Sequence, residues 1–297
     1  MTLSRLFVLA LGVVASLAPC LSCAQENEEQ AKANKPEKIK LLFIGNSFTF
    51  YNSLNKTIQD MLNVSGVPAV AKRSAPGGWR FRQHFNGETP KDYKDKPTPE
   101  TIRSQKWDYV VLQEQSSGAV DHRAEFLEFG KKLCDMIREN NPETKILLYQ
   151  TWQRCPGMFE GYGVNADGET RNAVLASWTK RYGEPSDATI EALQDGMQGG
   201  YAKLAELTGA TVAPVGQAFF TVGDKYDLYC DEGDKKPFHP NPLGTYLGGC
   251  VFFKTITGKS PVGLYQKLVA AGKEYKLTAE EAAYLEEVAD KTVADVK

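Results

Sequence analysis

Apolar and polar positions follow two alternating patterns along most of the chain. Nearly continuous apolar runs of strand length predict buried strands at five places, residues 39–45, 67–74, 107–113, 144–152 and 210–216. Between these runs, apolar residues recur at helical spacing, as Leu54, Ile58, Met61 and Leu62 do after the first run. Strands that alternate with helices favour one doubly wound α/β domain around a five-stranded parallel sheet.

The first 24 residues follow a different pattern. Arg5 precedes an apolar stretch that is shorter than the roughly 20 residues needed to span a bilayer, and the small residues Ser22 and Ala24 follow it. This order predicts a secretory signal peptide, residues 1–24, with cleavage after Ala24. We therefore expect a secreted or periplasmic protein.

Cys23 provides an alternative for the mature amino terminus. A bacterial lipoprotein would be anchored at the cell envelope through this thiol, but Cys20 occupies a position where lipoprotein motifs prefer Leu. The polar residues 25–37 that follow predict an unstructured tether. The remaining residues, 38–297, contain no linker, so we expect a single domain.

One long segment, residues 153–185, departs from the regular alternation. Among its glycines and polar residues it contains Met158, Phe159, Tyr162, Trp178 and Tyr182. Connections of this length in a compact fold are usually functional or disordered. The aromatic content favours a lid or a substrate wall, and a small helical insertion that packs on the domain is the alternative.

Composition and charge narrow the functional classes. The formal net charge of −2 gives no reason to expect nucleic acid or an anionic membrane as a partner. Neither a P-loop nor a GxGxxG motif follows a predicted strand, so we expect no nucleotide or flavin cofactor. The chain has three histidines and no CxxC pair after the predicted signal peptide, which argues against a zinc site.

Four cysteines follow the predicted signal peptide: Cys134, Cys155, Cys230 and Cys250. Export permits disulfides, and four thiols allow three pairings that the sequence does not rank. The sequence also leaves the oligomeric state open.

Candidate functional residues lie at the ends of the predicted strands. Ser47, Gln115 and Trp152 all fall just past the carboxyl ends of strands, where ligands bind in sheets of this kind. The first strand ends in Gly45-Asn46-Ser47, a turn that can hold a serine hydroxyl at the mouth of the sheet. A serine nucleophile in turn needs a base that takes its proton.

The three histidines are the first candidates for that base. We expect His84, in a helical stretch, to pack on the body of the domain. His122 opens a predicted helix, which favours a capping or surface role. His239 lies in a predicted loop, follows several acidic residues in the sequence and precedes a Pro-rich helix start. It is therefore the candidate base.

Four segments in this order resemble the motif blocks of the SGNH (GDSL-type) hydrolases. They are IGNSF with Ser47, APGGWRF with Gly77 and Gly78, VVLQEQS, and FHPNPLGTYLGGC with His239. Each block alone is a weak signal, but together they cover nearly the whole mature chain and indicate a sub-branch with LQEQS as its third block. The resemblance implies a flavodoxin-like, three-layer α/β/α fold and an esterase that uses no cofactor.

The resemblance also implies roles for individual residues. Ser47 would be the nucleophile, and His239 would be its base. The oxyanion hole would combine the backbone N–H groups of Ser47 and Gly78, with Gly77 as the alternative to Gly78. Gln115 stands where the family usually has an Asn that supplies the third donor, and its amide offers the same N–H groups on a longer side chain.

A second departure from the family concerns the acidic partner of His239. The family usually has Asp three residues before the histidine, where this chain has Lys236. Asp234 and Asp231 lie further upstream, and we favour Asp234 over Asp231 as the residue that orients the imidazole. There are two alternatives. A backbone carbonyl could orient His239 in a Ser–His dyad, or the chain could be an inactive member of the family.

The substrate that these features predict is an ester of a short acyl group, such as O-acetyl, on a carbohydrate. Export and the aromatic-rich segment favour it, with Trp79, Trp152 and Trp178 as candidate sugar-binding residues, although a tryptophan after a strand is often a core residue. A lipase or lysophospholipase is the nearest alternative. A non-catalytic protein of the same fold that binds a glycan or a phosphate ligand is another.

Overall fold

The structure is a computed structural model that describes residues 37–115, 118–152, 187–229 and 239–295. From Lys38 onward the chain forms one compact unit. The predicted signal peptide, nearly all of the predicted tether and the segment 153–185 lie outside the described residues.

Five parallel strands form a single sheet in the order β2-β1-β3-β4-β5. The strands are β1 (Ile39–Ile44), β2 (Ala69–Ser74), β3 (Tyr109–Leu112), β4 (Lys145–Tyr149) and β5 (Thr211–Ala213). Each lies within one of the predicted runs, so the predicted five-stranded parallel sheet is confirmed. Because β1 pairs with β2 on one side and with β3 on the other, the strand order reverses at β1. Ligands bind outside the carboxyl ends of the strands at such a point.

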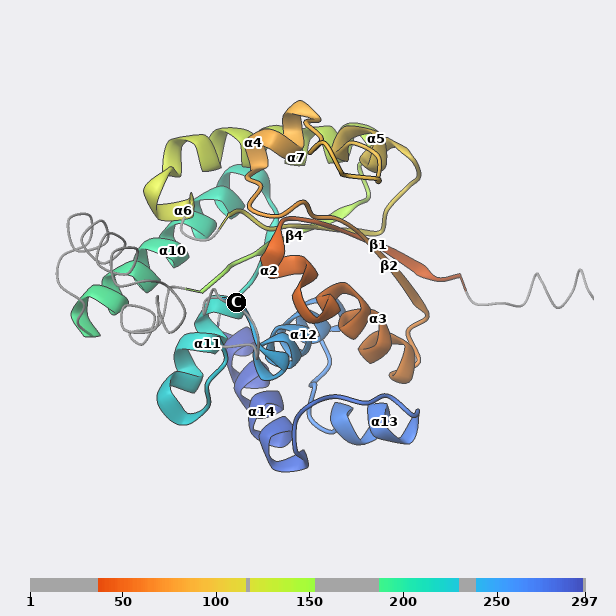
Figure 1. Ribbon diagram of the computed structural model, residues 1–297, viewed down its shortest axis with the longest axis vertical. Coiled ribbons are helices and arrows are strands. Elements are labelled where there is room, and N and C mark those ends of the chain that lie inside the picture. Colours follow the sequence, from red (N-terminus) through yellow and green to blue (C-terminus); the bar gives the residue numbers. More distant parts are fainter. Residues whose placement is uncertain (1–36, 116–117, 153–186, 230–238, 296–297) are drawn as a thin grey trace, which may run out of the picture. The chain divides into compact units, whose positions relative to one another are not determined.

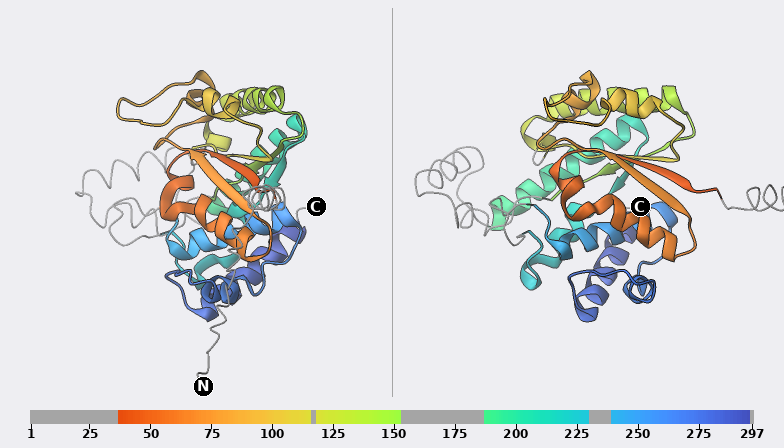
Figure 2. Two further views of the ribbon diagram at one scale, coloured as in Figure 1. Left: turned by 90° about the vertical axis from the view of Figure 1, so that its right-hand side faces the viewer. Right: turned by 45° about the vertical axis from the view of Figure 1, so that its right-hand side comes forward.

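Helices cover both faces of the sheet (Figures 1 and 2). One layer contains α3 (Leu54–Val64), α11 (Val215–Val222), α12 (Pro242–Thr257), α13 (Leu264–Ala270) and α14 (Ala279–Asp295). The other contains α4 (Phe81–Asn86), α5 (Thr98–Arg103), α6 (Gly118–Asp121), α7 (Arg123–Asn140) and α10 (Asp187–Thr208). Three short elements complete the described helices: α2 (Ser47–Phe50), η1 (Tyr51–Ser53) and η2 (Gly223–Lys225). The three-layer α/β/α architecture is thus the predicted one.

The strands send alternate side chains into two separate cores. In β1, Leu41 and Phe43 join the core under α3 and α12, whereas Leu42 and Ile44 join the core under α7 and α10. This alternation follows from the two-residue period of a strand. A sheet that is buried on both faces needs apolar residues at every position, and this explains why the strands appear in the sequence as continuous apolar runs.

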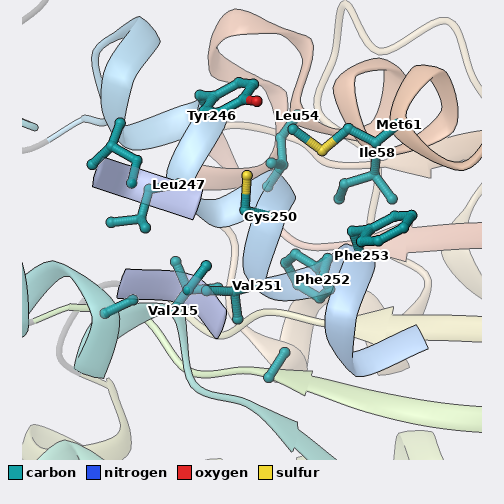
Figure 3. Close-up of a cluster of buried hydrophobic side chains, with 14 of the residues drawn as sticks. Leu54, Ile58, Met61, Val215, Tyr246, Leu247, Cys250, Val251, Phe252 and Phe253 are labelled. Carbon is teal, nitrogen blue, oxygen red and sulfur yellow. The ribbon is translucent and has the colours of Figure 1, made fainter. Parts of the chain in front are cut away.

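Helix α12 is the most deeply buried helix of the first layer. Ten of its residues are buried, from Gly244 to Phe253 without interruption, and Figure 3 shows several of them packed against the α3 side chains of Leu54, Ile58 and Met61. A helix that is buried on all sides is held firmly in place, so the loop that enters it is fixed at one end. Within the described residues, no helix is long and apolar enough to cross a membrane.

The two described cysteines are buried free thiols. Cys134 lies in the core under α7 and α10, and Cys250 lies in the core on the other face of the sheet. Burial raises the pKa of the Cys134 thiol to about 11 and raises the pKa of Cys250 well above its usual value. Each of the three possible schemes of two disulfides uses both residues, so none of them is present. Cys155 and Cys230 lie outside the described residues.

Substitution of Gly216 by Ala tests how tightly α11 packs on the end of β4. A Cβ atom at Gly216 would lie 2.0 Å from the carbonyl oxygen of Thr151, whereas one at Gly248 of α12 would make ordinary contacts, the nearest 3.5 Å from Val215 Cγ1. Gly216→Ala should lower the free energy of unfolding by about 1–3 kcal/mol. Gly248→Ala should leave it unchanged or raise it by up to about 1 kcal/mol. Urea unfolding measures both, and equal stabilities of the two variants would contradict the packing described here.

Candidate active site

The loops that follow β1, β2, β3 and β4 meet at the carboxyl edge of the sheet. They carry Gly45–Ser47, Ala75–Trp79, Gln113–Gln115 and Gln150–Trp152, respectively. Since β2, β1 and β3 are neighbours in the sheet, the first three loops are neighbours as well. These three loops contain the first three of the motif segments that the sequence singled out.

Ser47 is the first residue of α2, directly after β1. Asn46 caps this helix, because its side-chain oxygen accepts a hydrogen bond of 3.2 Å from the backbone N–H of Phe48. Ser47 itself is half-buried, and its backbone N–H has no acceptor within the helix because it belongs to the first turn. The strand therefore ends in a short capped turn that leaves the serine at the sheet edge.

A pair of buried amides joins this turn to β3. Gln113 Oε1 accepts from the backbone N–H of Asn46 at 2.8 Å and from the hydroxyl of Thr49 at 2.9 Å. Gln113 Nε2 donates to Asn46 Oδ1 at 3.0 Å and also to the backbone oxygen of Glu114. Asn46 Nδ2 donates to the backbone oxygen of Trp79 at 2.8 Å. One network thus links the ends of all three strands.

Position 45 requires glycine, because the neighbouring side chains leave no space for a Cβ atom. A Cβ atom there would lie 2.5 Å from both Gln113 Oε1 and Thr49 Oγ1. The Gly of the IGNSF segment is therefore required by the close approach of the two loops.

His84 holds the same turn from the other side. Its Nε2 lies 2.9 Å from the carbonyl oxygen of Gly45, and its Nδ1 lies 2.7 Å from the hydroxyl of Thr98. A carbonyl only accepts, so Nε2 carries the proton and Nδ1 accepts from Thr98 when the ring is neutral. Burial lowers the pKa of His84 to about 4, which keeps it neutral at pH 7. His84 is a packed structural residue, as predicted.

Gly78 turns the loop after β2 through the left-handed region. Its φ is +72°, and both Gly77 and Gly78 are exposed. Trp79 follows and is half-buried, with its ring 5.1 Å from the ring of His84 and 6.5 Å from that of Tyr93. The loop therefore has an exposed glycine pair beside a partly accessible indole.

Glu114 connects this loop to the segment after β3. Its two carboxylate oxygens accept from the backbone N–H groups of Phe81, at 2.9 Å, and Gln115, at 2.7 Å. Burial raises the pKa of Glu114 to about 7, although both hydrogen bonds and nearby Arg80 act to lower it. Gln115 is half-buried, so its side chain is less enclosed than that of Gln113 two residues earlier.

His239 lies against the helix that begins with Ser47. Its ring stacks on the ring of Tyr51, with centroids 3.8 Å apart and planes within 15°, and it meets Phe48 edge to face at 5.8 Å. The backbone N–H of Tyr51 bonds to the carbonyl oxygen of Ser47, so the two residues are one helical turn apart. The structure thus places the histidine of the last motif against two residues, Phe48 and Tyr51, that closely follow the serine of the first. Among the described residues, no hydrogen bond joins the Ser47 hydroxyl to His239.

Trp152 is a core residue. Its indole stacks on Phe219 at 4.1 Å and on Phe48 at 4.6 Å, and only 2% of the residue is exposed. The prediction that Trp152 contacts a sugar does not hold for a ring buried in this way. Its packing instead supports the helix that carries Ser47, because Phe48 is the next residue.

Several predicted site residues lie outside the described part of the chain. They are Asp231, Asp234 and Trp178, together with Lys236 and Cys23. Within the described residues, no group of three or more His, Cys, Asp or Glu side chains is arranged to hold a metal ion.

The residues that hold the loops together have no role that the sequence pattern predicts. Asn46, Gln113 and Glu114 are all at most 3% exposed, and the motifs that contain them assign them no structural role. A usable signal was present, because Gln113 and Glu114 directly follow a buried strand, and a buried polar side chain needs partners.

Comparison with solved structures identifies the fold. The chain is similar to a DUF4886 family protein from Bacteroides uniformis, with 18% identity over 87% of this chain and 95% of that one, and a TM-score of 0.61. It is also similar to a proposed SGNH hydrolase from Slackia heliotrinireducens, with 24% identity over 74% of this chain and 100% of that one, and a TM-score of 0.54. No protein-family model and no curated protein matches the sequence. The protein has the α/β/α fold of the SGNH hydrolases, which confirms the predicted resemblance at the level of the fold.

Glu114 and His84 should have opposite effects on the pH dependence of stability. The folded-state pKa of Glu114 is raised from 4.5 to about 7, so its contribution to stability is present below pH 4.5 and is lost as the pH rises through 7. The folded-state pKa of His84 is lowered from 6.5 to about 4, so its contribution is present above pH 6.5 and is lost as the pH falls through 4. Between pH 4.5 and 6.5 the two effects largely cancel.

Glu114→Gln should remove this compensation. Relative to the wild type, the variant should lose about 2 kcal/mol of unfolding free energy as the pH falls from 6.5 to 4.5. Urea unfolding at several pH values measures the difference. Glu139→Gln, at an exposed carboxylate of α7, serves as the control and should keep the wild-type pH dependence. Parallel curves for Glu114→Gln and the wild type would show that Glu114 does not titrate in this range.

Proposed function

We propose that the protein is an exported serine esterase that removes O-acetyl or similar short acyl groups from carbohydrates. Ser47 is the nucleophile, and His239 is its base. Asp234, or Asp231 in its place, orients the imidazole. The observation that best supports this proposal is the stacking of His239 on Tyr51, one helical turn from Ser47. Residues four apart are neighbours on one side of a helical turn, so the contact of the imidazole with Tyr51 supports a position near Ser47.

The oxyanion of the reaction is held by the backbone N–H groups of Ser47 and Gly78 and by the amide of Gln115. The buried contacts of Asn46 and Glu114 support this assignment, because they fix the three loops relative to one another. Donors that are fixed before the reaction stabilise the developing charge most effectively. The left-handed φ of Gly78 further favours glycine at this position.

The reaction proceeds by acyl transfer in two steps. His239 takes the proton from the Ser47 hydroxyl while the serine oxygen attacks the ester carbonyl carbon. The tetrahedral intermediate collapses, the carbon–oxygen bond to the alcohol breaks, and the imidazolium gives its proton to the alcohol. Water then attacks the acyl-serine with His239 again as base, which releases the acid and restores the serine. Apo geometry often leaves the serine–histidine hydrogen bond long, and it shortens when the substrate binds.

A short acyl group is supported by where the exposed apolar residues lie. The large exposed hydrophobic residues of the described chain are Leu207 in α10, Val262 before α13 and Val269 in α13. None of them belongs to the loops at the carboxyl edge. A lipase would need an apolar surface for a long acyl chain beside the serine, whereas half-buried Trp79 offers an aromatic face that suits a sugar.

Substitution of the proposed nucleophile and base should abolish most of the activity. Ser47→Ala and His239→Ala should each lower kcat/KM for p-nitrophenyl acetate at least about 1,000-fold. Ser104→Ala and His122→Ala are the matched controls, since both residues are exposed, and they should retain wild-type activity. Undiminished activity of Ser47→Ala would disprove the mechanism.

The same assay distinguishes the remaining alternatives. Of Asp231→Asn and Asp234→Asn, the variant with the larger decrease in kcat/KM identifies the residue that orients His239. Equally mild decreases in both variants would favour a dyad. Acetate should be released from acetyl-xylan, and p-nitrophenyl acetate should react faster than p-nitrophenyl octanoate. Faster hydrolysis of the octanoate would favour a lipase, and glycan binding without release of acetate would favour a non-catalytic role.

Export can be examined independently of activity. When the full chain is produced in a bacterium, the protein should leave the cytoplasm, and its mature form should begin at Gln25. Amino-terminal sequencing and mass measurement of the exported protein check this prediction. A mature chain that begins with a lipid-modified Cys23 would support the lipoprotein alternative, and a chain that keeps residues 1–24 would contradict cleavage.

A further inference from the structure

We propose that Tyr51 and Asn52 together form a clamp that positions His239 for its reaction with Ser47. The inference rests on the proposed esterase function, and it concerns two residues that the family resemblance does not assign. Tyr51 and Asn52 begin η1, immediately after the helix that carries the serine. Each of them contacts the segment of the chain that carries the histidine.

The two contacts hold adjacent parts of that segment. The Tyr51 ring stacks on the imidazole of His239 with a centroid distance of 3.8 Å. Asn52 Nδ2 donates to the carbonyl oxygen of Pro240 at 2.8 Å and to the hydroxyl of Thr245, in the first turns of α12, at 3.1 Å. Tyr51 therefore fixes the imidazole ring, and Asn52 fixes the backbone of the residue that follows His239.

The backbone of the clamp is strained. Asn52 has φ 46° and ψ 21°, and Ser53 has φ 55° and ψ 46°. They are the two non-glycine residues with positive φ in the described chain. Asn tolerates this region better than most residues, but two such residues in succession still cost roughly 1–3 kcal/mol each. Strain of this kind persists where surrounding contacts enforce it, and it clusters at functional sites.

The segment that carries His239 is also held from its far side. The backbone N–H of Asn241 donates to the carbonyl oxygen of Leu228 at 3.0 Å, and its side-chain nitrogen donates to that of Asp227 at 2.6 Å. Asn241 Oδ1 caps α12 by accepting from Gly244 at 2.9 Å. His239 and Pro240 thus lie between the clamp on one side and a firmly anchored helix cap on the other.

Stacking also suits the charge change that the proposed mechanism requires. The imidazole becomes positive when it takes the serine proton, and the face of an aromatic ring attracts a cation. A stacked tyrosine therefore stabilises the protonated form while it restricts rotation of the ring. Tyr51 acts through His239 and does not touch the reacting atoms, so it is a positioning residue.

Variants of the clamp should lower turnover more than substrate binding. Tyr51→Leu and Asn52→Gly should each lower kcat for p-nitrophenyl acetate about 3- to 10-fold, with KM changed less than about twofold. Glycine is chosen at position 52 because it keeps the left-handed backbone and removes only the amide. Tyr51→Phe keeps the ring and should retain wild-type kcat. An equal loss in Tyr51→Phe would assign the effect to the hydroxyl and overturn the role of stacking.

Proton NMR of the histidines tests the clamp without any substrate. The chain has three histidines, so the His239 signal can be assigned by its absence in His239→Ala. In Tyr51→Leu, the pH midpoint of the His239 titration should fall by about half a unit, because the ring no longer stabilises the cation. An unchanged or higher midpoint would overturn the proposal, as would an unchanged kcat in both variants.

The NMR result separates the two hypotheses. If the wild type hydrolyses none of the esters, the proposed function fails, whereas a lowered midpoint in Tyr51→Leu still supports the contact. If the wild type is active and the variants match it in kcat and in midpoint, the clamp fails and the proposed function stands.

Discussion

The carboxyl edge of the sheet depends on one interaction, the hydrogen bonds between the buried amides of Asn46 and Gln113. Each amide offers both donors and acceptors, so the pair can satisfy itself and still bond to the neighbouring loops. Gln113 holds the serine turn, and Asn46 holds the loop after β2 through Trp79. In a buried site the loss of one partner leaves the others without hydrogen bonds, and such loss costs more than the bond itself contributes.

Two buried titratable groups reinforce this arrangement from opposite sides. His84 holds the carbonyl of Gly45, and Glu114 holds the N–H groups of Phe81 and Gln115. Burial disfavours the charged form of both, which lowers one pKa and raises the other. The loops at the sheet edge are thus fixed by polar side chains that have little access to water, and this suits a site whose hydrogen-bond donors must stay in place during a reaction.

The contact of His239 with Phe48 and Tyr51 follows from how two helices pack. Helix α3 continues the segment that begins with the serine turn, and α12 continues the segment that begins with the histidine. The helices approach closely at Gly249, where a Cβ atom would lie 2.9 Å from Met61 Cε. Because α12 is buried on all sides, its first turn is fixed, and with it the loop that carries His239.

The sequence by itself determined the strands, the layers and the loops that carry the chemistry. Parallel strands buried on both faces need continuous apolar runs, and the carboxyl ends of such strands meet at one edge, so both features are readable from local pattern. The tertiary structure decided which polar or aromatic residues turn inward. Gln113 is buried and Gln115 is half-exposed, although they are two residues apart in one motif. Likewise, Trp152 belongs to the core, while Tyr51 lies on His239. These outcomes depend on partners that are distant in the chain, and the periodicity of a single segment carries no information about them.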